Sequence, residues 1–275
     1  MGGRTLPLLE HTGHKSLSVE AGELISVLGA PGSGKSRLGL ELAFLTAPAE
    51  GKVLFHGTDP LAERRRFQPL KRPKEITMLV QDAEAQLFAR TVFDDVAFGP
   101  RHLRLPEPQI EARVQRALIS VRLDPQEVRG RSPFALSGGE RRRVALAGVL
   151  AMEPEVLILD EPTASLDPGT RNQFLDLLTP LRGRSAIIWF TASAREASLA
   201  SRIYLLLDGD TTEVPGGSAL WHRWRDLLAA GIELPAAFEL AGALESRGAG
   251  TIPGETAEAV EASIAENWKA RAHAR

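Results

Sequence analysis

The sequence predicts an α/β protein in which helices cover both faces of a largely parallel β-sheet. Two observations support this fold class. Short, almost wholly apolar runs alternate with helical patterns along the chain, and a glycine-rich loop joins one of these runs to a helix. The chain has 275 residues, 43% of them hydrophobic and 25% charged. That length suits one large domain with appended segments.

The apolar runs are predicted to be buried strands. They are nearly continuous in apolar residues, which is typical of parallel strands covered on both faces. The predicted strands are Glu23–Gly29, Glu75–Gln81, Glu155–Asp160, Ser185–Phe190 and Arg202–Asp208. Helices are predicted at Ser36–Leu45, Pro168–Leu181 and Ala194–Ala200.

Strand-like runs are absent from residues 82–150, where helical patterns take over. Within Pro108–Val121, apolar residues recur on one helical face at Ile110, Val114, Ala117 and Val121. We therefore predict a helical subdomain at about 82–150, inserted into a sheet domain that spans residues 1–217. Residues 218–275 are rich in alanine and helical in pattern, and we interpret them as a C-terminal helical extension and a candidate dimerisation region.

Composition argues against several classes of protein. The chain has no cysteine, so it has no disulfide framework. A formal net charge of −2 argues against binding nucleic acid by bulk electrostatics, and we expect no nucleic-acid partner. We expect no signal peptide, because the first residues lack its apolar stretch. The apolar runs are shorter than the roughly 18–20 residues that a membrane span needs.

The glycine-rich loop is GAPGSGKS, Gly29–Ser36, between a predicted strand and a predicted helix. Its glycines let backbone N–H groups point inward, where they and the helix N-terminus can cradle phosphate oxygens. The lysine would reach the β and γ phosphates, and the serine after it would offer a hydroxyl to Mg²⁺. The residues predicted to bind phosphate are Gly29, Gly32, Ser33, Gly34, Lys35 and Ser36.

Two carboxylates follow another buried strand in the stretch VLILDE. Ligands of open α/β sheets bind at the carboxyl ends of parallel strands, where Asp160 and Glu161 lie. Asp160 can hold the Mg²⁺ shell, and Glu161 can polarise an attacking water.

A third motif, LSGGE, precedes a long apolar run. Ser137 and Glu140 have the spacing of a capping box at a helix N-terminus. Gly138 and Gly139 leave the backbone N–H groups of that end open to an anion. The phosphate loop already provides one such end, so we expect this second one to serve another site.

Taken together, these motifs resemble the nucleotide-binding subunit of an ABC transporter. GAPGSGKS is similar to its Walker A motif, LSGGE to its signature and VLILDE to its Walker B. ASLD, ending at Asp167, is similar to its D-loop, and Gln81 matches the Q-loop glutamine. The stretch Gln81–Pro100, QDAEAQLFARTVFDDVAFGP, resembles that of energy-coupling factor ATPases, which serve cobalt and vitamin importers.

The resemblance implies an ABC cassette of the P-loop NTPase class, with a RecA-like sheet core and an inserted helical subdomain. It implies ATP and Mg²⁺ as cofactors, with Ser36, Gln81 and Asp160 as metal ligands and Glu161 and Gln81 as catalytic residues. Ser137, Gly138, Gly139 and Asp167 would bind nucleotide as well, the signature residues acting across a dimer.

By the same resemblance, the chain would power an importer of a micronutrient, either a vitamin or a transition-metal ion. It would pair head to tail with a second ATPase subunit, in a homodimer or a heterodimer. An integral membrane subunit would dock near Gln81–Pro100, so the chain would lie peripherally on the cytoplasmic face of the cell membrane. Arg141–Arg143 would either add positive charge near the interface or form a solvated helix face.

The stretch Gln81–Pro100 is unusually apolar for a segment bounded by turn residues. Thr91 is predicted to cap a helix through Phe98, whose apolar stripe can pack against the helical subdomain. Leu87, Phe88 and Phe98 exceed what that stripe needs. We interpret the segment as core and docking surface at once.

Three features depart from the family pattern. Ala192 stands where the switch histidine is expected, and the signature ends in Glu140 instead of glutamine. The first 19 residues contain no Tyr, Phe or Trp to stack on adenine, for which His11 or His14 would be a substitute. These departures predict slow hydrolysis at this chain's own site.

Three alternatives remain open. One is an ATPase from another class of ABC importer, which the Gln81–Pro100 segment disfavours. Another is a low-activity regulatory nucleotide-binding subunit of an asymmetric heterodimer, which Ala192 supports. A soluble ABC ATPase of DNA repair or translation would need a long coiled coil or a second cassette, and the sequence has neither.

Overall fold

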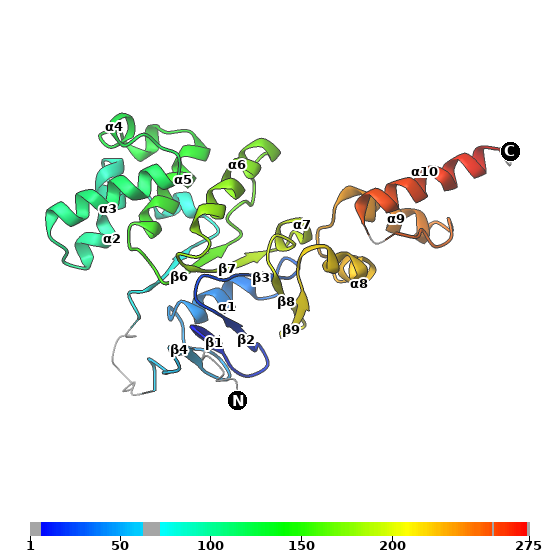
Figure 1. Ribbon diagram of the computed structural model, residues 1–275, viewed down its shortest axis with the longest axis horizontal. Coiled ribbons are helices and arrows are strands. Elements are labelled where there is room, and N and C mark those ends of the chain that lie inside the picture. The colour runs from blue at the N-terminus through cyan, green and yellow to red at the C-terminus, as the bar shows by residue number, and fades with distance from the viewer. Residues whose placement is uncertain (1–6, 63–71, 255, 274–275) are drawn as a thin grey trace. The chain divides into compact units, whose positions relative to one another are not determined.

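We describe a computed structural model of the chain that covers residues 7–62, 72–254 and 256–273. The chain divides into two compact units, described separately below. The first consists of residues 1–24 and 36–189, and the second of residues 25–35 and 190–275. Figure 1 labels the elements of both units.

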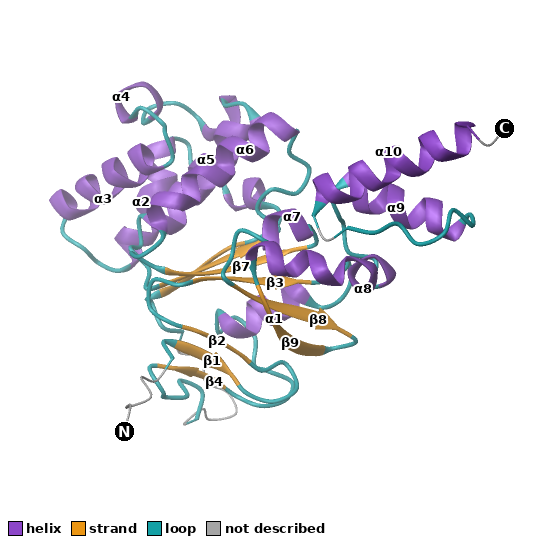
Figure 2. Cartoon of the chain, turned by 45° about the vertical axis from the view of Figure 1, so that its right-hand side comes forward, coloured by secondary structure: helices purple, strands orange, loops and turns teal. Residues whose placement is uncertain are grey.

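The first unit contains a small antiparallel sheet that the sequence did not predict. Its strands are β1 (Leu9–His11), β2 (Leu17–Val19) and β4 (Val53–Phe55), in the order β2-β1-β4 (Figure 2). Each strand has three residues, which is too short for an alternating pattern to be recognised.

Three of the predicted strands lie side by side in the first unit. They are β5 (Ile76–Leu79), β6 (Val156–Asp160) and β7 (Ala186–Thr191), which ends in the second unit. β5 and β6 are parallel, with Leu79 opposite Leu159. Every residue of the three strands is buried, as continuous apolar runs predict.

Residues 82–150 contain only helices and loops, as predicted. The elements are η1 (Ala83–Gln86), α2 (Val92–His102), α3 (Glu107–Ser120), α4 (Pro125–Val128), η2 (Pro133–Ala135) and α5 (Gly138–Leu150). α2, α3 and α5 pack pairwise against one another. The predicted apolar face of α3 is buried in that packing. The first unit also holds α6 (Pro168–Leu178), which continues as η3 (Thr179–Leu181), and nearly all of α1 (Lys35–Leu42).

The second unit contains the strands β3 (Leu24–Leu28), β8 (Arg202–Leu207) and β9 (Asp210–Pro215). β3 and β8 are parallel, and β9 turns back antiparallel to β8. β9 was not among the predicted strands, although Asp208-Gly209 between β8 and β9 is a strong hairpin signal. Both turn residues have positive φ, 50° and 89°, as a two-residue hairpin of this kind requires.

The C-terminal part of the second unit is helical, as predicted. Its elements are α7 (Ala194–Ala197), η4 (Gly217–Arg223), α8 (Trp224–Ala229), α9 (Ala236–Ser246) and α10 (Ala257–His273). α9 packs against α8 and α10, and the buried rings of Trp224 and Phe238 lie 5.5 Å apart.

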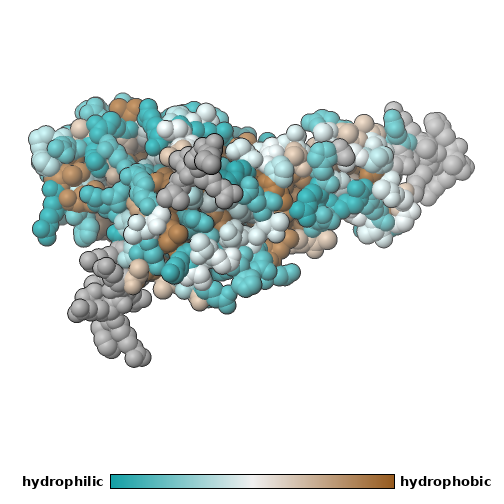
Figure 3. All heavy atoms as spheres, turned by 60° about the horizontal axis from the view of Figure 1, so that its bottom comes forward, coloured by the Kyte–Doolittle hydropathy of each residue, from teal (hydrophilic) through white to brown (hydrophobic). Residues whose placement is uncertain are grey.

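On the face drawn in Figure 3, hydrophobic residues form small groups among hydrophilic ones. Large apolar side chains that remain exposed include Leu45, Phe88, Phe98, Ile119, Phe134, Leu199, Leu240 and Trp268. Across the described ranges, none of the helices combines the length and the apolar character needed to cross a bilayer.

Candidate functional site

The phosphate loop lies at the carboxyl end of β3, in the second unit. Gly32 and Gly34 have φ of +81° and +95°, and among the described residues no heavy atom other than those of the chain neighbours lies within 4 Å of where a Cβ of either would stand. Lys35 Nζ donates to the carbonyl oxygens of Gly29 and Ala30, at 2.8 and 3.0 Å. These bonds fold the Lys35 side chain over the loop and leave it only 5% exposed.

The base of the loop admits no side chain at Gly29. A Cβ there would stand 2.6 Å from Ser33 Oγ and 2.9 Å from the Leu206 carbonyl oxygen. The Ser33 hydroxyl is buried, with no hydrogen-bond partner among the described residues. The Gly29 N–H donates to the Thr191 carbonyl oxygen at 3.2 Å, which fastens the loop to the end of β7.

The two predicted acidic residues stand where β6 ends. Asp160 is buried and Glu161 is half-buried. Glu161 has φ of +47°, a left-handed conformation that non-glycine residues seldom adopt and that is frequent at functional sites. Because β5 and β6 are parallel neighbours in register, their carboxyl ends lie at one sheet edge. Gln81, two residues beyond β5, is therefore at the same edge as both carboxylates.

LSGGE forms the predicted capping box at the start of α5. Glu140 Oε2 accepts from the Ser137 N–H at 2.9 Å and from its hydroxyl at 2.7 Å. The Glu140 N–H donates to Ser137 Oγ at 3.3 Å. These bonds from Ser137 hold the pKa of the Glu140 carboxyl below its usual range. A Cβ on Gly139 would stand 3.3 Å from Thr170 Cγ2, so its missing side chain also makes room for α6.

Three consecutive arginines tie the first two turns of α5 to other segments. Arg141 Nε pairs with Glu84 Oε2 at 2.6 Å, and its Nη1 donates to the Leu136 carbonyl oxygen at 2.9 Å. Arg142 is buried and donates to the Ala164 carbonyl oxygen at 2.7 Å. Arg143 donates to the Arg122 carbonyl oxygen at 3.5 Å. Arg142 is therefore not part of the solvated face that we considered for this run, whereas Arg141 and Arg143 are half-buried.

The segment before α2 borders a groove of about 670 Å³ in the first unit. Phe88 and Phe98, 59% and 55% exposed, line it with their rings edge to face at 4.9 Å. Leu87, which we counted as surplus to the core, is 7% exposed and belongs to it. Asp95 Oδ2 accepts from the N–H groups of Phe88 and Ala89, at 3.1 and 2.8 Å. Burial raises the pKa of this Asp95 carboxyl.

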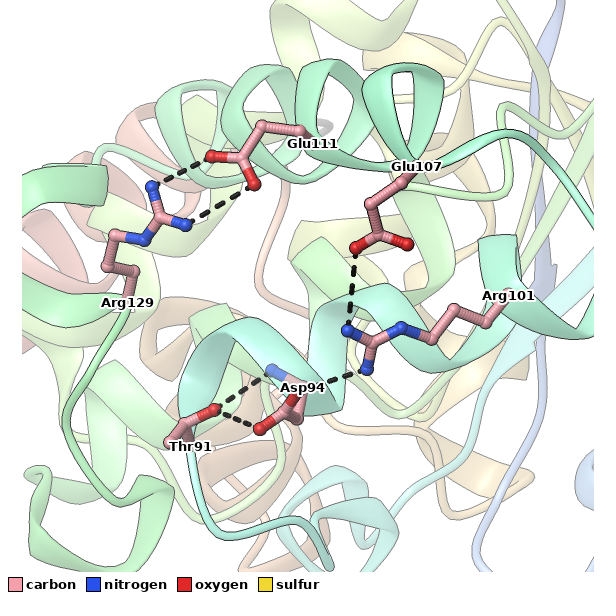
Figure 4. A network of polar contacts seen from close by, with 6 residues as sticks. All are labelled: Thr91, Asp94, Arg101, Glu107, Glu111 and Arg129. Carbon is pink, nitrogen blue, oxygen red and sulfur yellow. Dashed lines mark hydrogen bonds and ion pairs between the residues drawn. The ribbon is translucent and has the colours of Figure 1, made fainter.

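A polar network fixes the start of α2, as Figure 4 shows. Thr91 caps the helix as predicted, since its Oγ1 accepts from the Asp94 N–H at 3.1 Å. Its hydroxyl also donates to Asp94 Oδ2 at 2.6 Å, and Arg101 pairs with Asp94 Oδ1 at 3.0 Å. The bond from Thr91, followed by that from Arg101, lowers the pKa of Asp94. Arg101 also reaches Glu107 on α3 at 3.7 Å, so the network joins two helices.

The ABC transporter family model matches residues 13–164. The energy-coupling factor transporter ATP-binding protein EcfA2 of Symbiobacterium thermophilum is 42% identical over 235 residues, covering 85% of this chain and 81% of that protein. The chain is an energy-coupling factor ATPase. The cobalt import ATP-binding protein CbiO of Rhodobacter capsulatus is 40% identical, covering 82% of this chain and 80% of its own.

The fold of this chain matches that of a solved relative. The structure of cbiO1 from Clostridium perfringens, part of the ABC transporter complex cbiONQ, matches with a TM-score of 0.67 and 28% identity. The match covers 88% of this chain and 95% of that one. The predicted P-loop ABC cassette is thereby confirmed, and the chain is an ABC ATPase.

The residue at the switch position and the two histidines considered for stacking on adenine differ in their surroundings. Ala192 follows β7 and is half-buried, and its methyl group offers no hydrogen bond. His11 is buried in the small sheet, with Nε2 3.5 Å from Glu41 Oε2, so it faces the interior and is no candidate for stacking on adenine. That burial lowers the pKa of His11. His14, in contrast, is exposed.

Asp167 has a structural task of its own. Its Oδ1 accepts from the N–H groups of Gly169 and Thr170, at 3.0 and 3.1 Å, and so caps α6. Thr170 is the main cause of the lowered pKa of Asp167. The sequence analysis did not foresee this cap, although Asp before Pro at a helix start is a common signal.

Proposed function

We propose that this chain binds and hydrolyses ATP to power an energy-coupling-factor importer of a micronutrient, a vitamin or a transition-metal ion. The observation that carries the proposal is the sheet edge where Gln81 meets Asp160 and Glu161. An amide and two carboxylates at the carboxyl ends of parallel strands form a site for Mg-ATP and water. The two relatives named above, an energy-coupling factor transporter ATP-binding protein and a cobalt import ATP-binding protein, support the proposal.

In this proposal the phosphate loop binds the nucleotide. The space around Gly32 and Gly34 is open, and N–H groups of the loop would cradle the phosphate oxygens there. Lys35 would move its ammonium from two loop carbonyls to the β and γ phosphates, one polar contact replacing another. Ser33, whose buried hydroxyl needs a partner, would add a further bond.

The donor set for a metal fits Mg²⁺. Ser36, Gln81 and Asp160 would offer a hydroxyl, an amide oxygen and a carboxylate, all hard oxygen ligands. When bound, Mg²⁺ neutralises charge that develops on the phosphates. Glu161 would orient and polarise the attacking water, and its left-handed backbone fixes where its side chain starts.

The signature residues would act on a second ATPase subunit. Ser137 is exposed at the start of α5, where Gly138 and Gly139 bring the backbone close to the surface. An exposed helix N-terminus of this length suits a phosphate held by a neighbour. The partner would be a copy of this chain or a different subunit, with Asp167 at the same interface. The extension 218–275 would add dimer contacts to the cassette, 1–217.

The groove beside α2 would receive an integral membrane subunit. Phe88 and Phe98 expose a paired aromatic surface, and aromatic side chains commonly anchor interfaces. Docking there would hold the chain peripherally on the cytoplasmic face of the membrane. A second candidate function, a regulatory nucleotide-binding subunit of a heterodimer, is favoured by Ala192.

Replacement of Lys35 tests the proposal. Lys35→Ala should weaken ATP binding about 10²-fold, because a charged hydrogen-bond partner of the phosphates is lost. The fold should persist, since the bonds from Nζ to Gly29 and Ala30 lie within the loop itself. Calorimetric titration with Mg-ATP measures the affinity, and Lys52→Ala, at an exposed lysine outside the loop, is the control. Equal affinity in both variants would reject the phosphate-loop assignment.

A further inference from the structure

The connection between α8 and α9, Gly231–Leu234, is firmly anchored within the C-terminal extension. Ile232 and Leu234 are buried, and the Ile232 N–H donates to the Leu227 carbonyl oxygen at 3.0 Å. The Leu234 N–H donates to Glu239 Oε1 at 3.3 Å, on the first turn of α9. The segment therefore moves with these helices and not as a free loop.

Between those anchors, the backbone of Glu233 bonds residues 191–194, the segment around Ala192 that we call the switch loop. The Glu233 N–H donates to the Ala192 carbonyl oxygen at 3.1 Å, and the Ala194 N–H donates to the Glu233 carbonyl oxygen at 2.9 Å. The two bonds flank Ser193 and make a parallel bridge outside the named strands. Figures 1 and 2 both draw α7, which starts at Ala194, beside α8.

The switch loop in turn holds the phosphate loop. The carbonyl oxygen of Thr191 accepts from the Gly29 N–H at 3.2 Å. Its hydroxyl accepts from the Ser193 N–H at 3.0 Å and donates to buried Glu196 at 2.8 Å. A Cβ on Gly231 would stand 3.9 Å from Ala30 Cβ, so a side chain at this position of the extension would come into van der Waals contact with the phosphate loop.

We propose that Gly231–Leu234 is a positioning element for ATP turnover, through which the C-terminal extension sets the backbone of the switch loop and of the phosphate loop. The element acts through the main-chain bonds of Glu233, because the Glu233 side chain is exposed. With a methyl group at position 192, the switch side chain cannot anchor the loop to a γ-phosphate. The backbone bonds from Glu233 of the extension then hold this loop in place. The inference deepens the proposed function and rests on the phosphate loop being the ATP site.

The test removes one backbone donor. Glu233→Pro deletes the N–H that bonds Ala192, whereas the matched Glu233→Ala keeps both main-chain bonds and removes only the side chain. Turnover of Glu233→Pro should fall about 10-fold or more, because small displacements of catalytic groups cost up to about 10²-fold. Glu233→Ala should stay within about twofold of wild type. The rise in melting temperature on adding Mg-ATP, measured alongside, should shrink only in the proline variant.

A second pair of variants covers the case in which Glu233→Pro does not fold. Gly231→Asn places a side chain toward Ala30 at φ of +73°, and Gly248→Asn meets open space at φ of +82°. Asparagine tolerates that backbone region, so the pair differs mainly in contact with the phosphate loop. Gly231→Asn should reduce turnover and ATP-dependent stabilisation, and Gly248→Asn should not.

The inference is overturned if Glu233→Pro folds and matches Glu233→Ala, or if the two asparagine variants behave alike. Failure of wild type to bind Mg-ATP would instead refute the proposed function, so the two failures are distinguishable.

Discussion

Replacing the exposed aromatic pair of the groove should separate docking from folding. Phe88 and Phe98 are each more than half exposed, so a serine at either position loses only part of a phenylalanine's burial energy. Full burial of such a side chain contributes about 1.5–3 kcal/mol. Because each ring keeps less than half of its burial, each substitution should cost less than half of that free energy. Together with the lost contact between the rings, the double variant should lose about 2 kcal/mol of stability. The cost of placing a serine in a true core would be several kcal/mol higher.

The assay measures folding and partner binding on the same preparations. Urea unfolding of the purified chain gives the stability loss, and co-purification from solubilised membranes gives retention of the membrane subunit. Phe134→Ser is the matched control, because Phe134 is 62% exposed and does not line the groove. The double variant should stay folded and lose the membrane subunit, while Phe134→Ser keeps it. A double variant that loses several kcal/mol, with partner loss only in step with unfolding, would refute the docking argument.

Three further predictions concern the site. Ala192→His should raise turnover of the purified chain by about 10²-fold, the usual value of one preorganised donor to developing charge; brisk wild-type turnover that histidine does not raise would contradict it. The stabilisation from the Glu140 carboxylate in the capping box should be complete above its ordinary pKa of 4.5 and be lost as pH falls through its lower folded-state pKa. Glu140→Gln should remove that part of the acid sensitivity in urea unfolding at stepped pH. A double-mutant cycle of Glu84→Gln and Arg141→Met should give a coupling of about 0.5–1 kcal/mol, and additive effects would show that the pair is inert.

The sequence predicted those parts of the fold that local pattern determines. Buried parallel strands such as β6 are continuous apolar runs, and the caps at Thr91 and Ser137 need only nearby residues. β1, β2 and β4 were missed because three residues carry too little periodicity. β9 was missed for a different reason, since its exposed edge is polar and lacks an apolar run.

Errors at the site came from contacts between residues far apart in sequence. His11 is buried because α1 supplies Glu41 beside it, which no local pattern indicates. Leu87 and Phe88 are adjacent and both apolar, yet Leu87 is buried in the core and Phe88 is exposed at the surface. The partners of Arg141 and Arg142 lie 57 and 22 residues away, so their roles depend on tertiary structure.

The three arginines of α5 have a mechanical consequence. A helix held at a single point can pivot, but the N-terminal part of α5 is held to Glu84, to the Ala164 carbonyl and to the Arg122 carbonyl at once. All three attachments oppose rotation of α5 about its own axis. The end of the helix that carries Ser137 is thus linked to the segment that carries Glu84.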